Sequence, residues 1–347
     1  MTLSRGTNPL DPIGEPVGPG AALHPSAVAG EGPLGAAGPV VGSAPRRGRR
    51  IRPRVADPAL WIGGGLVLAW VVVALTVPWW SPFDPVDYQD IGNRFAAPDA
   101  THLFGTDTLG RDVFARVMYG ARLSLPIAVT AVAISVLIGV TLGAVAGFAG
   151  GWLDEVVMRV SDLFLAFPAM VLALAIAAAL GPSGRNVVIA IVVVTWPEYT
   201  RLTRGQVLST RADLHVTAAE SVGCSRTRVF RRHVLPFATP AITVKMTVDL
   251  GMAILLAAGL SFIGVGAAPP APEWGAMVSE ARNFIDQWWL GLFPGLAILS
   301  IVLAFNFLGD ALRDRFDPRM RAQRGHRASG TAWRRLFLGQ RREREGV

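Results

Sequence analysis

Six long apolar runs alternate with polar segments along the chain. They cover residues 60–78, 123–149, 160–180, 187–202, 241–265 and 289–308. About 20 helical residues, each rising about 1.5 Å, cross a hydrocarbon core about 30 Å thick. The pattern therefore predicts an all-α, polytopic membrane protein with six transmembrane helices.

The polar segments between these runs divide the chain. We expect the first transmembrane helix at 58–80, an extracytoplasmic loop with a surface helix (110–119) at 81–122, and five further transmembrane helices within a core at 123–312. A polar loop, 201–236, interrupts this core. Residues 1–57 are rich in Gly, Pro and Ala and contain no aromatic residue, which predicts a disordered tail. Residues 313–347 form a basic C-terminal tail.

Arginine predicts which face is cytoplasmic. Six arginines cluster at 46–54, seven lie in 201–232, and eleven follow from Arg313 onward. Residues 81–122 instead hold four arginines against six aspartates. With six spans, all the basic segments fall on one face, which the positive-inside rule makes cytoplasmic. Both termini and the short loop 150–159 are then cytoplasmic.

Composition excludes several kinds of chemistry. The chain is 51% hydrophobic and 17% charged, as expected for a membrane protein. Its only lysine, Lys245, follows Val244, so no Walker A loop is present. The single cysteine, Cys224, excludes an intrachain disulfide and a Cys-based metal site. The sequence predicts no catalytic group, cofactor or metal in this chain. The basic cluster before the first span is a topology signal, so we expect membrane lipids and no nucleic acid as partners.

The loop 201–236 is too polar to span a membrane and too long for a simple turn. Thr210 and Asp213 resemble a capping pair that opens a helix, and Gly223 can end that helix in a left-handed conformation. Ser225 can cap a second helix reaching His233, after which Leu235–Pro236 turns the chain back toward the membrane. The expected product is a helix–turn–helix beneath the bilayer. By these properties alone, a plain amphipathic helix at the membrane interface is the favoured interpretation.

The motifs of this loop resemble the coupling loop of binding-protein-dependent ABC importer permeases. The family pattern is Glu-Ala-Ala-x3-Gly, then about nine residues, then Ile-x-Leu-Pro. Here the corresponding residues are Thr217, Ala218, Ala219, Glu220 and Gly223, followed by His233, Leu235 and Pro236. Thr217 replaces the family's glutamate. Blocks at 104–112, 161–168, 204–209, 260–266, 273–275, 305–310 and 317–319 resemble the same family in order, specifically the second permease of the dipeptide/oligopeptide/nickel branch.

The resemblance implies a type I ABC importer permease in the cytoplasmic (inner) membrane. It would work with a homologous permease subunit, two cytoplasmic ATP-binding subunits and an extracytoplasmic substrate-binding protein. ATP and Mg would be bound by the partner ATPases, so this chain is not itself an enzyme. The ATPase-coupling loop would consist of Thr217, Ala218, Ala219, Glu220, Gly223, Leu235 and Pro236. The expected substrates are di- or oligopeptides, or a similar small solute such as nickel.

Two carboxylates are candidates for the translocation path. Asp249 falls near the middle of the fifth span, where an ionisable residue is costly and therefore a functional candidate. Glu198 lies in the last turns of the fourth. For Asp249, the alternative interpretation is an interhelical contact with the partner permease. For Glu198, at the cytoplasmic mouth, a structural role is the favoured interpretation. The rival function is a self-sufficient secondary transporter, which would need ion-coupling sites at mid-membrane, where only Asp249 is a suitable charge.

Overall fold

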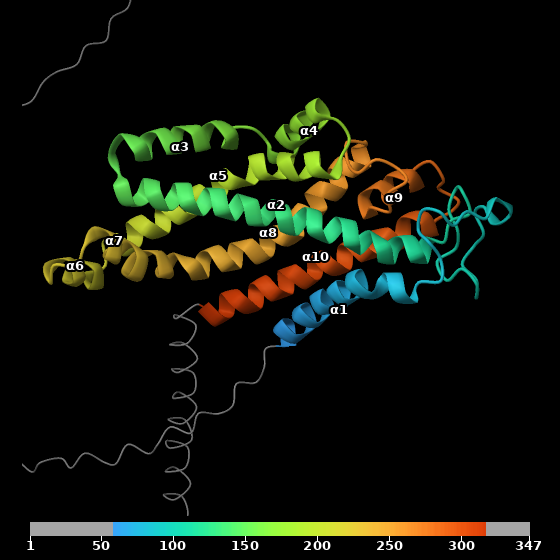
Figure 1. Ribbon diagram of the computed structural model, residues 1–347, viewed down its shortest axis with the longest axis horizontal. Helices are drawn as coiled ribbons and strands as arrows, with labels where there is room; N and C mark the ends of the chain where they lie inside the picture. Colours follow the sequence, from blue (N-terminus) through green and yellow to red (C-terminus); the bar gives the residue numbers. More distant parts are fainter. Residues whose placement is uncertain (1–57, 317–347) are drawn as a thin grey trace, which may run out of the picture. The chain divides into compact units, whose positions relative to one another are not determined.

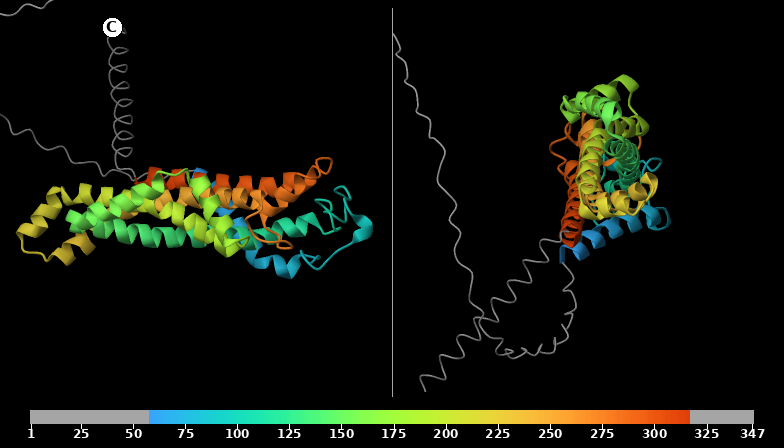
Figure 2. Two further views of the ribbon diagram at one scale, coloured as in Figure 1. Left: turned by 90° about the horizontal axis from the view of Figure 1, so that it is seen from above. Right: turned by 90° about the vertical axis from the view of Figure 1, so that its left-hand side faces the viewer.

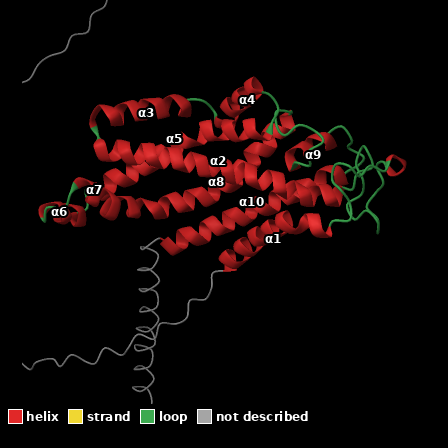
Figure 3. Ribbon diagram, viewed as in Figure 1, coloured by secondary structure: helices red, strands yellow, loops and turns green. Residues whose placement is uncertain are grey.

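The structure is a computed structural model that describes residues 58–316; the tails expected at 1–57 and 313–347 lie outside this range, apart from residues 313–316. All regular elements of the described part are helices (Figure 3), which confirms the all-α prediction. In chain order they are α1 (Pro58–Trp80), η1 (Ile91–Asn93), α2 (Val113–Ala149), α3 (Gly151–Leu165), α4 (Ala169–Leu180), α5 (Gly184–Arg211), α6 (Leu214–Ser221), α7 (Arg226–Val229), η2 (Phe230–Val234), α8 (Leu235–Ile263), α9 (Trp274–Ala281) and α10 (Trp289–Phe316).

The long helices form one bundle with two distinct ends. Along the chain, α1, α2, the α3–α4 pair, α5, α8 and α10 run alternately between these ends (Figures 1 and 2). We call one the α6 end, which carries α6 and α7, and the other the α9 end, which carries α9 and the irregular segment 81–112. The start of α1 and the finish of α10 both point toward the α6 end (Figure 1). This alternation is compatible with six membrane crossings.

Length and hydropathy support fewer spans than expected. Within residues 58–316, four helices are long and apolar enough to cross a membrane: α1, α2, the continuous helix Arg226–Ile263, and α10. The third predicted run is a pair of helices, α3 and α4, bent by 86°, which would supply a fifth span. The fourth run lies in α5, whose second half carries Glu198, Arg201, Arg204 and Arg211. With these charges α5 is less apolar than the four candidate spans, so the six-span prediction is not confirmed.

Small residues bring α2 and α5 into close contact. A Cβ atom at Gly139 would lie 2.6 Å from the carbonyl oxygen of Trp196, and one at Gly143 would lie 2.3 Å from that of Thr200. Gly147, one further turn along, faces Val207. Backbones approach this closely only where side chains are absent, as is typical of helix pairs in membranes. The two helices therefore form the tightly packed centre of the bundle.

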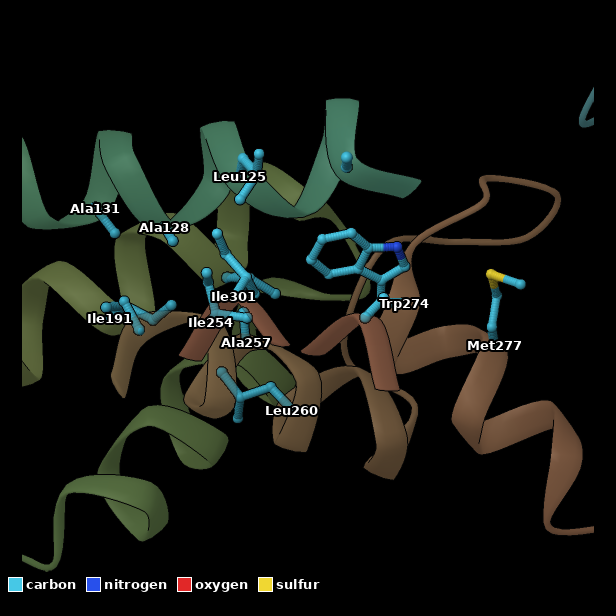
Figure 4. Packing of buried hydrophobic residues seen from close by; sticks show 14 of the residues in the cluster. Leu125, Ala128, Ala131, Ile191, Ile254, Ala257, Leu260, Trp274, Met277 and Ile301 are labelled. Carbon is cyan, nitrogen blue, oxygen red and sulfur yellow. The ribbon is translucent and has the colours of Figure 1, made fainter. Parts of the chain in front are cut away.

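The main apolar core lies where α2, α5, α8 and α10 converge toward the α9 end (Figure 4). Trp274 of α9 is fully buried in it and donates its indole N–H to the carbonyl oxygen of Val117 at 2.8 Å. The other labelled residues of this core are Leu125, Ala128, Ala131, Ile191, Ile254, Ala257, Leu260, Met277 and Ile301. The α9 end is thereby anchored to the spanning helices.

A buried network of charges closes the α9 end. The carboxylate of Asp107 accepts hydrogen bonds from the Arg111 backbone N–H at 2.9 Å, from Arg111 Nε at 2.7 Å, and from Arg116 Nη1. Glu280 of α9 contacts Arg116 at 3.4 Å. Asp107, Arg111 and Arg116 are all nearly inaccessible to solvent. Buried charges are tolerated only when they are paired and hydrogen-bonded, so this network fixes the segment before α2 against α9.

The surface helix expected at 110–119 is not a separate element. Asp112 caps a helix by accepting the backbone N–H of Ala115 at 2.7 Å, and that helix, α2, continues for 37 residues to Ala149. The Asp112 carboxylate also lies 2.8 Å from His102 Nδ1. At about 1.5 Å per residue, α2 is about 55 Å long, so its first turns extend beyond any single bilayer crossing. The prediction was wrong because polar residues near its start were taken to separate it from the span.

The loop expected at 150–159 is also helical, because α3 begins at Gly151. Four of its large apolar side chains are exposed: Trp152, Val156, Val160 and Leu163. Glu155 and Arg159 are exposed as well and lie 3.8 Å apart. Asp154, which is only 17% exposed, pairs with Arg204 of α5, as a largely buried carboxylate requires. Local polarity made this segment resemble a loop.

Candidate coupling site

The short helix α6 stands at the tip of the α6 end (Figure 1). Asp213 occupies its N-cap position without a side-chain capping hydrogen bond. At its C-terminus, Gly223 has φ +84°, the left-handed conformation that its position predicts. The backbone N–H of Gly223 donates to the backbone carbonyl oxygen of Glu220 at 2.9 Å, and that of Cys224 donates to the carbonyl oxygen of Ala219 at 3.1 Å. These bonds end α6 and return the chain toward the bundle.

One face of α6 is almost completely open. Leu214 and Val222 are 87% and 86% exposed, and Ala218 lies midway between them, also exposed. Residues at positions i, i+4 and i+8 share one side of a helix. Thr217, at the position of the family's glutamate, is exposed, as is Glu220. We call Leu214, Ala218 and Val222 the α6 stripe.

The opposite face of α6 is packed against its own chain. Val216 is buried together with Val207, Val229 and Val234, and Ala219 packs against this group. We call these four valines the second core. The two alanines of the motif therefore differ: Ala218 faces outward, whereas Ala219 is half-buried against the second core. Only Ala218 is available for close approach by another protein.

Two phenylalanine rings connect the second core to the end of α2. Phe148, next to the end of α2, contacts Phe230 with ring centroids 4.8 Å apart. The guanidinium of Arg211 lies 5.3 Å from the centre of the Phe148 ring. Arg211 Nη1 donates to the carbonyl oxygens of Gly147 at 3.1 Å and Phe148 at 3.0 Å. A cation at a helix C-terminus satisfies carbonyls that lack helical partners. The last residue of α5 is thus fixed to the end of α2.

Leu235 and Pro236 do not turn the chain. They open α8, which follows α7 and η2 without a break, so residues 226–263 form one continuous helix. Proline is tolerated in the first turn of a helix, because its missing N–H has no partner there. The actual reversal of the chain lies at 222–225, around Gly223. The expected turn at Leu235–Pro236 was wrong, since a helical turn that admits proline looks like a break in the sequence.

The two candidate carboxylates of the translocation path are brought together by Lys245. Its Nζ lies 2.6 Å from Glu198 Oε2 on α5 and 3.0 Å from Asp249 Oδ2 on α8. The ammonium also lies 5.1 Å from the ring centre of Tyr199. Glu198 is 47% exposed at the surface of the chain, whereas Lys245 and Asp249 are more buried. The expected isolated charge at Asp249 is therefore part of a three-residue cluster that carries one excess negative charge.

Sequence reasoning missed the partners that hold this end together. The contact of Arg211 with Gly147 and that of Lys245 with Glu198 join residues that are 64 and 47 positions apart in the sequence. The i+4 spacing of Lys245 and Asp249 on one helix was the available signal for their pairing. Four exposed arginines also surround the returning chain: Arg226, Arg228, Arg231 and Arg232. They make the surface beside α6 basic.

A family model described as "Binding-protein-dependent transport system inner membrane component" matches residues 139–322, which include α5 to α10 and the whole α6 end. The chain is also similar to curated relatives over most of their lengths. It is 42% identical to the dipeptide transport system permease protein DppC of Alkalihalophilus pseudofirmus, over 75% of this chain and 86% of the relative.

Two further relatives give the same result. The probable D,D-dipeptide transport system permease protein DdpC of Escherichia coli is 43% identical over 73% of this chain and 85% of its own length. The glutathione transport system permease protein GsiD of Pectobacterium atrosepticum is 39% identical over 79% and 90%. By both comparisons, the chain belongs to the family of inner-membrane permeases of binding-protein-dependent transport systems.

Proposed function

We propose that this chain is the membrane-spanning subunit of an ATP-driven peptide importer, and that α6 is the element that docks on a partner ATPase. The observation that carries the docking role is the α6 stripe: two large apolar side chains nearly fully exposed, one on the first residue of α6 and one on its C-cap residue. Exposed apolar surface of this kind is typical of an interaction site. The neighbouring arginines suit acidic groups on the partner or lipid phosphates.

The α6 end is cytoplasmic in this proposal, and both termini lie on the same side. The arginine-rich segments support that orientation. ATP and Mg are bound and used by the two partner ATPases. This chain performs no catalysis; it forms part of the translocation path and changes conformation when the ATPases move. A homologous permease completes the pore, and an extracytoplasmic binding protein delivers substrate at the α9 end. We assign peptides as substrates because the relatives are named for dipeptide and glutathione transport.

The face that carries Glu198, Lys245 and Asp249 lines the translocation path or the contact with the homologous permease. Glu198 is half-exposed on a chain whose helices cross a membrane. A carboxylate facing lipid is costly, so exposed intramembrane charges turn toward protein or water. Because the cluster has two carboxylates and one ammonium, placing its surface against lipid would cost more than for a neutral ion pair.

The docking role is tested by Ala218→Arg. The long side chain would prevent close contact at the centre of the α6 stripe without entering the second core. Ser209→Arg, an exposed position on α5, is the matched control. We expect Ala218→Arg to lose co-purifying ATPase subunits and labelled-dipeptide uptake at a normal permease level, whereas Ser209→Arg keeps both. Normal assembly and uptake in Ala218→Arg would reject docking through α6.

A further inference from the structure

Arg204 of α5 and Asp154 of α3 form the best-aligned ion pair at the α6 end. Arg204 Nε donates to Asp154 Oδ1 at 2.5 Å, and Arg204 Nη2 donates to Asp154 Oδ2 at 2.6 Å. This is the two-pronged geometry in which guanidinium and carboxylate bind most strongly. The side chains are 32% and 17% exposed, so solvent screens the pair only partly. Arg204 also begins a sequence block (204–209) to which the docking proposal gives no role.

Few other contacts hold α3 to the bundle. Ser161 is its only fully buried residue, and four of its large apolar side chains are exposed. Near its C-terminal end, Phe164 meets Trp196 of α5 with ring centroids 5.5 Å apart. Asp162 lies 3.9 Å from Arg201, with both side chains more than half exposed. Such a separated, solvated pair contributes little. The start of α3 is held by its connection to α2 through Gly150, by the half-buried Leu153 and Val157, and by the Asp154–Arg204 pair, its strongest polar contact with α5.

The position of Arg204 connects this pair to α6. Arg204 lies seven residues, or about two helical turns, before the end of α5 at Arg211, and α6 begins three residues later. A displacement of α6 acts on α5 as well as on α7 and η2, because Val216 packs against Val207, Val229 and Val234. At its other end α3 leads into α4 through the bend of 86°. A firm link between α5 and α3 near α6 thus connects α6 with that bend.

We propose that Arg204 and Asp154 are positioning residues that make α3 follow α5 when a bound ATPase moves α6. The inference rests on the proposed function and adds a mechanical role for residues that touch neither ATP nor substrate. In this role the pair does not hold the ATPase. It determines how much of each ATP-driven movement reaches the α3–α4 bend, and therefore how much substrate is transported per ATP hydrolysed.

A charge-swap experiment tests the inference in the assembled transporter with its ATPases. The variants are Asp154→Arg, Arg204→Asp and the double swap, with Asp154→Asn as a milder change that keeps the side-chain shape. The matched control is the solvated pair, as Arg201→Asp alone and with Asp162→Arg. The readouts are ATPase co-purification, ATP hydrolysis, and dipeptide uptake per ATP hydrolysed.

We expect the single variants at Asp154 and Arg204 to keep their ATPases but to lose roughly 2- to 30-fold in uptake per ATP, the range for residues that transmit coupling. The double swap should regain most of that loss, and the control pair should change little. Wild-type uptake per ATP in the singles, including Asp154→Asn, would overturn the inference. So would a defect that the swap leaves uncorrected, or a loss of assembly in all single variants. Failure of the unmodified chain to bind ATPases would instead reject the proposed function.

Discussion

The two ends of the bundle are built in opposite ways. The α9 end is closed by buried charges, by Trp274 and by helix caps, and nearly all its polar groups find partners within the chain. The α6 end is held by four valines, two phenylalanine rings and Arg211, and it leaves apolar side chains of α6 more than 85% exposed. Both ends expose large apolar side chains, since Ile285 at the α9 end is 85% exposed. The ends differ in what holds them together: buried ion pairs at the α9 end, and apolar contacts at the α6 end.

The largest effect should follow from breaking the α9 end. Asp107→Ala leaves Arg111 and Arg116 buried with one carboxylate fewer. Removing one member of a buried ion network costs about 3–5 kcal/mol. We therefore expect a clear fall in the thermal midpoint of the purified protein, whereas Glu155→Gln, in an exposed pair at 3.8 Å, changes it little. Equal midpoints for both variants would show that the network does not stabilise this end.

A smaller, local effect is expected in the second core. Val229→Ala removes two carbons from a fully buried site, which costs about 2 kcal/mol from lost burial and the cavity left behind. Because this core lies apart from the main core, the loss should be confined to the α6 end. Hydrogen exchange should accelerate in 214–234 and stay unchanged in 274–281. Acceleration in both segments would mean that the ends are not independent.

Gly223→Val should have the smallest effect on stability but a visible one on docking. A Cβ there meets no atom within 4 Å, so the cost comes only from the left-handed backbone and is on the order of 1 kcal/mol. We expect less ATPase co-purification at a normal permease level. Gly223→Asn is the control, because asparagine tolerates this conformation. Equal ATPase co-purification by the valine and asparagine variants would show that the left-handed backbone at Gly223 does not affect docking.

The sequence predicted those structural elements that depend on residues close together in the chain. Hydropathy located the long apolar helices, and Gly223 marked the end of α6, because helix periodicity and glycine conformation act over a few residues. The errors fall where polar residues are satisfied from a distance. Asp154 resembled part of a loop because its partner, Arg204, is 50 residues away. Lys245 likewise joins carboxylates on two helices, one of them 47 residues away. Such pairings depend on how helices are packed, which no local pattern encodes.

The central claim, that α6 is open until a partner ATPase covers it, is tested most directly by thiol labelling. Cys224 is the chain's only cysteine, so a Cys224→Ser background allows single reporters at Ala218→Cys on α6 and at Thr101→Cys, an exposed position in 81–112. We expect the reporter at 218 to label rapidly in the isolated permease and slowly once the ATPases are bound, while the reporter at 101 labels equally in both. Unchanged labelling at 218 in the assembled transporter would contradict the account.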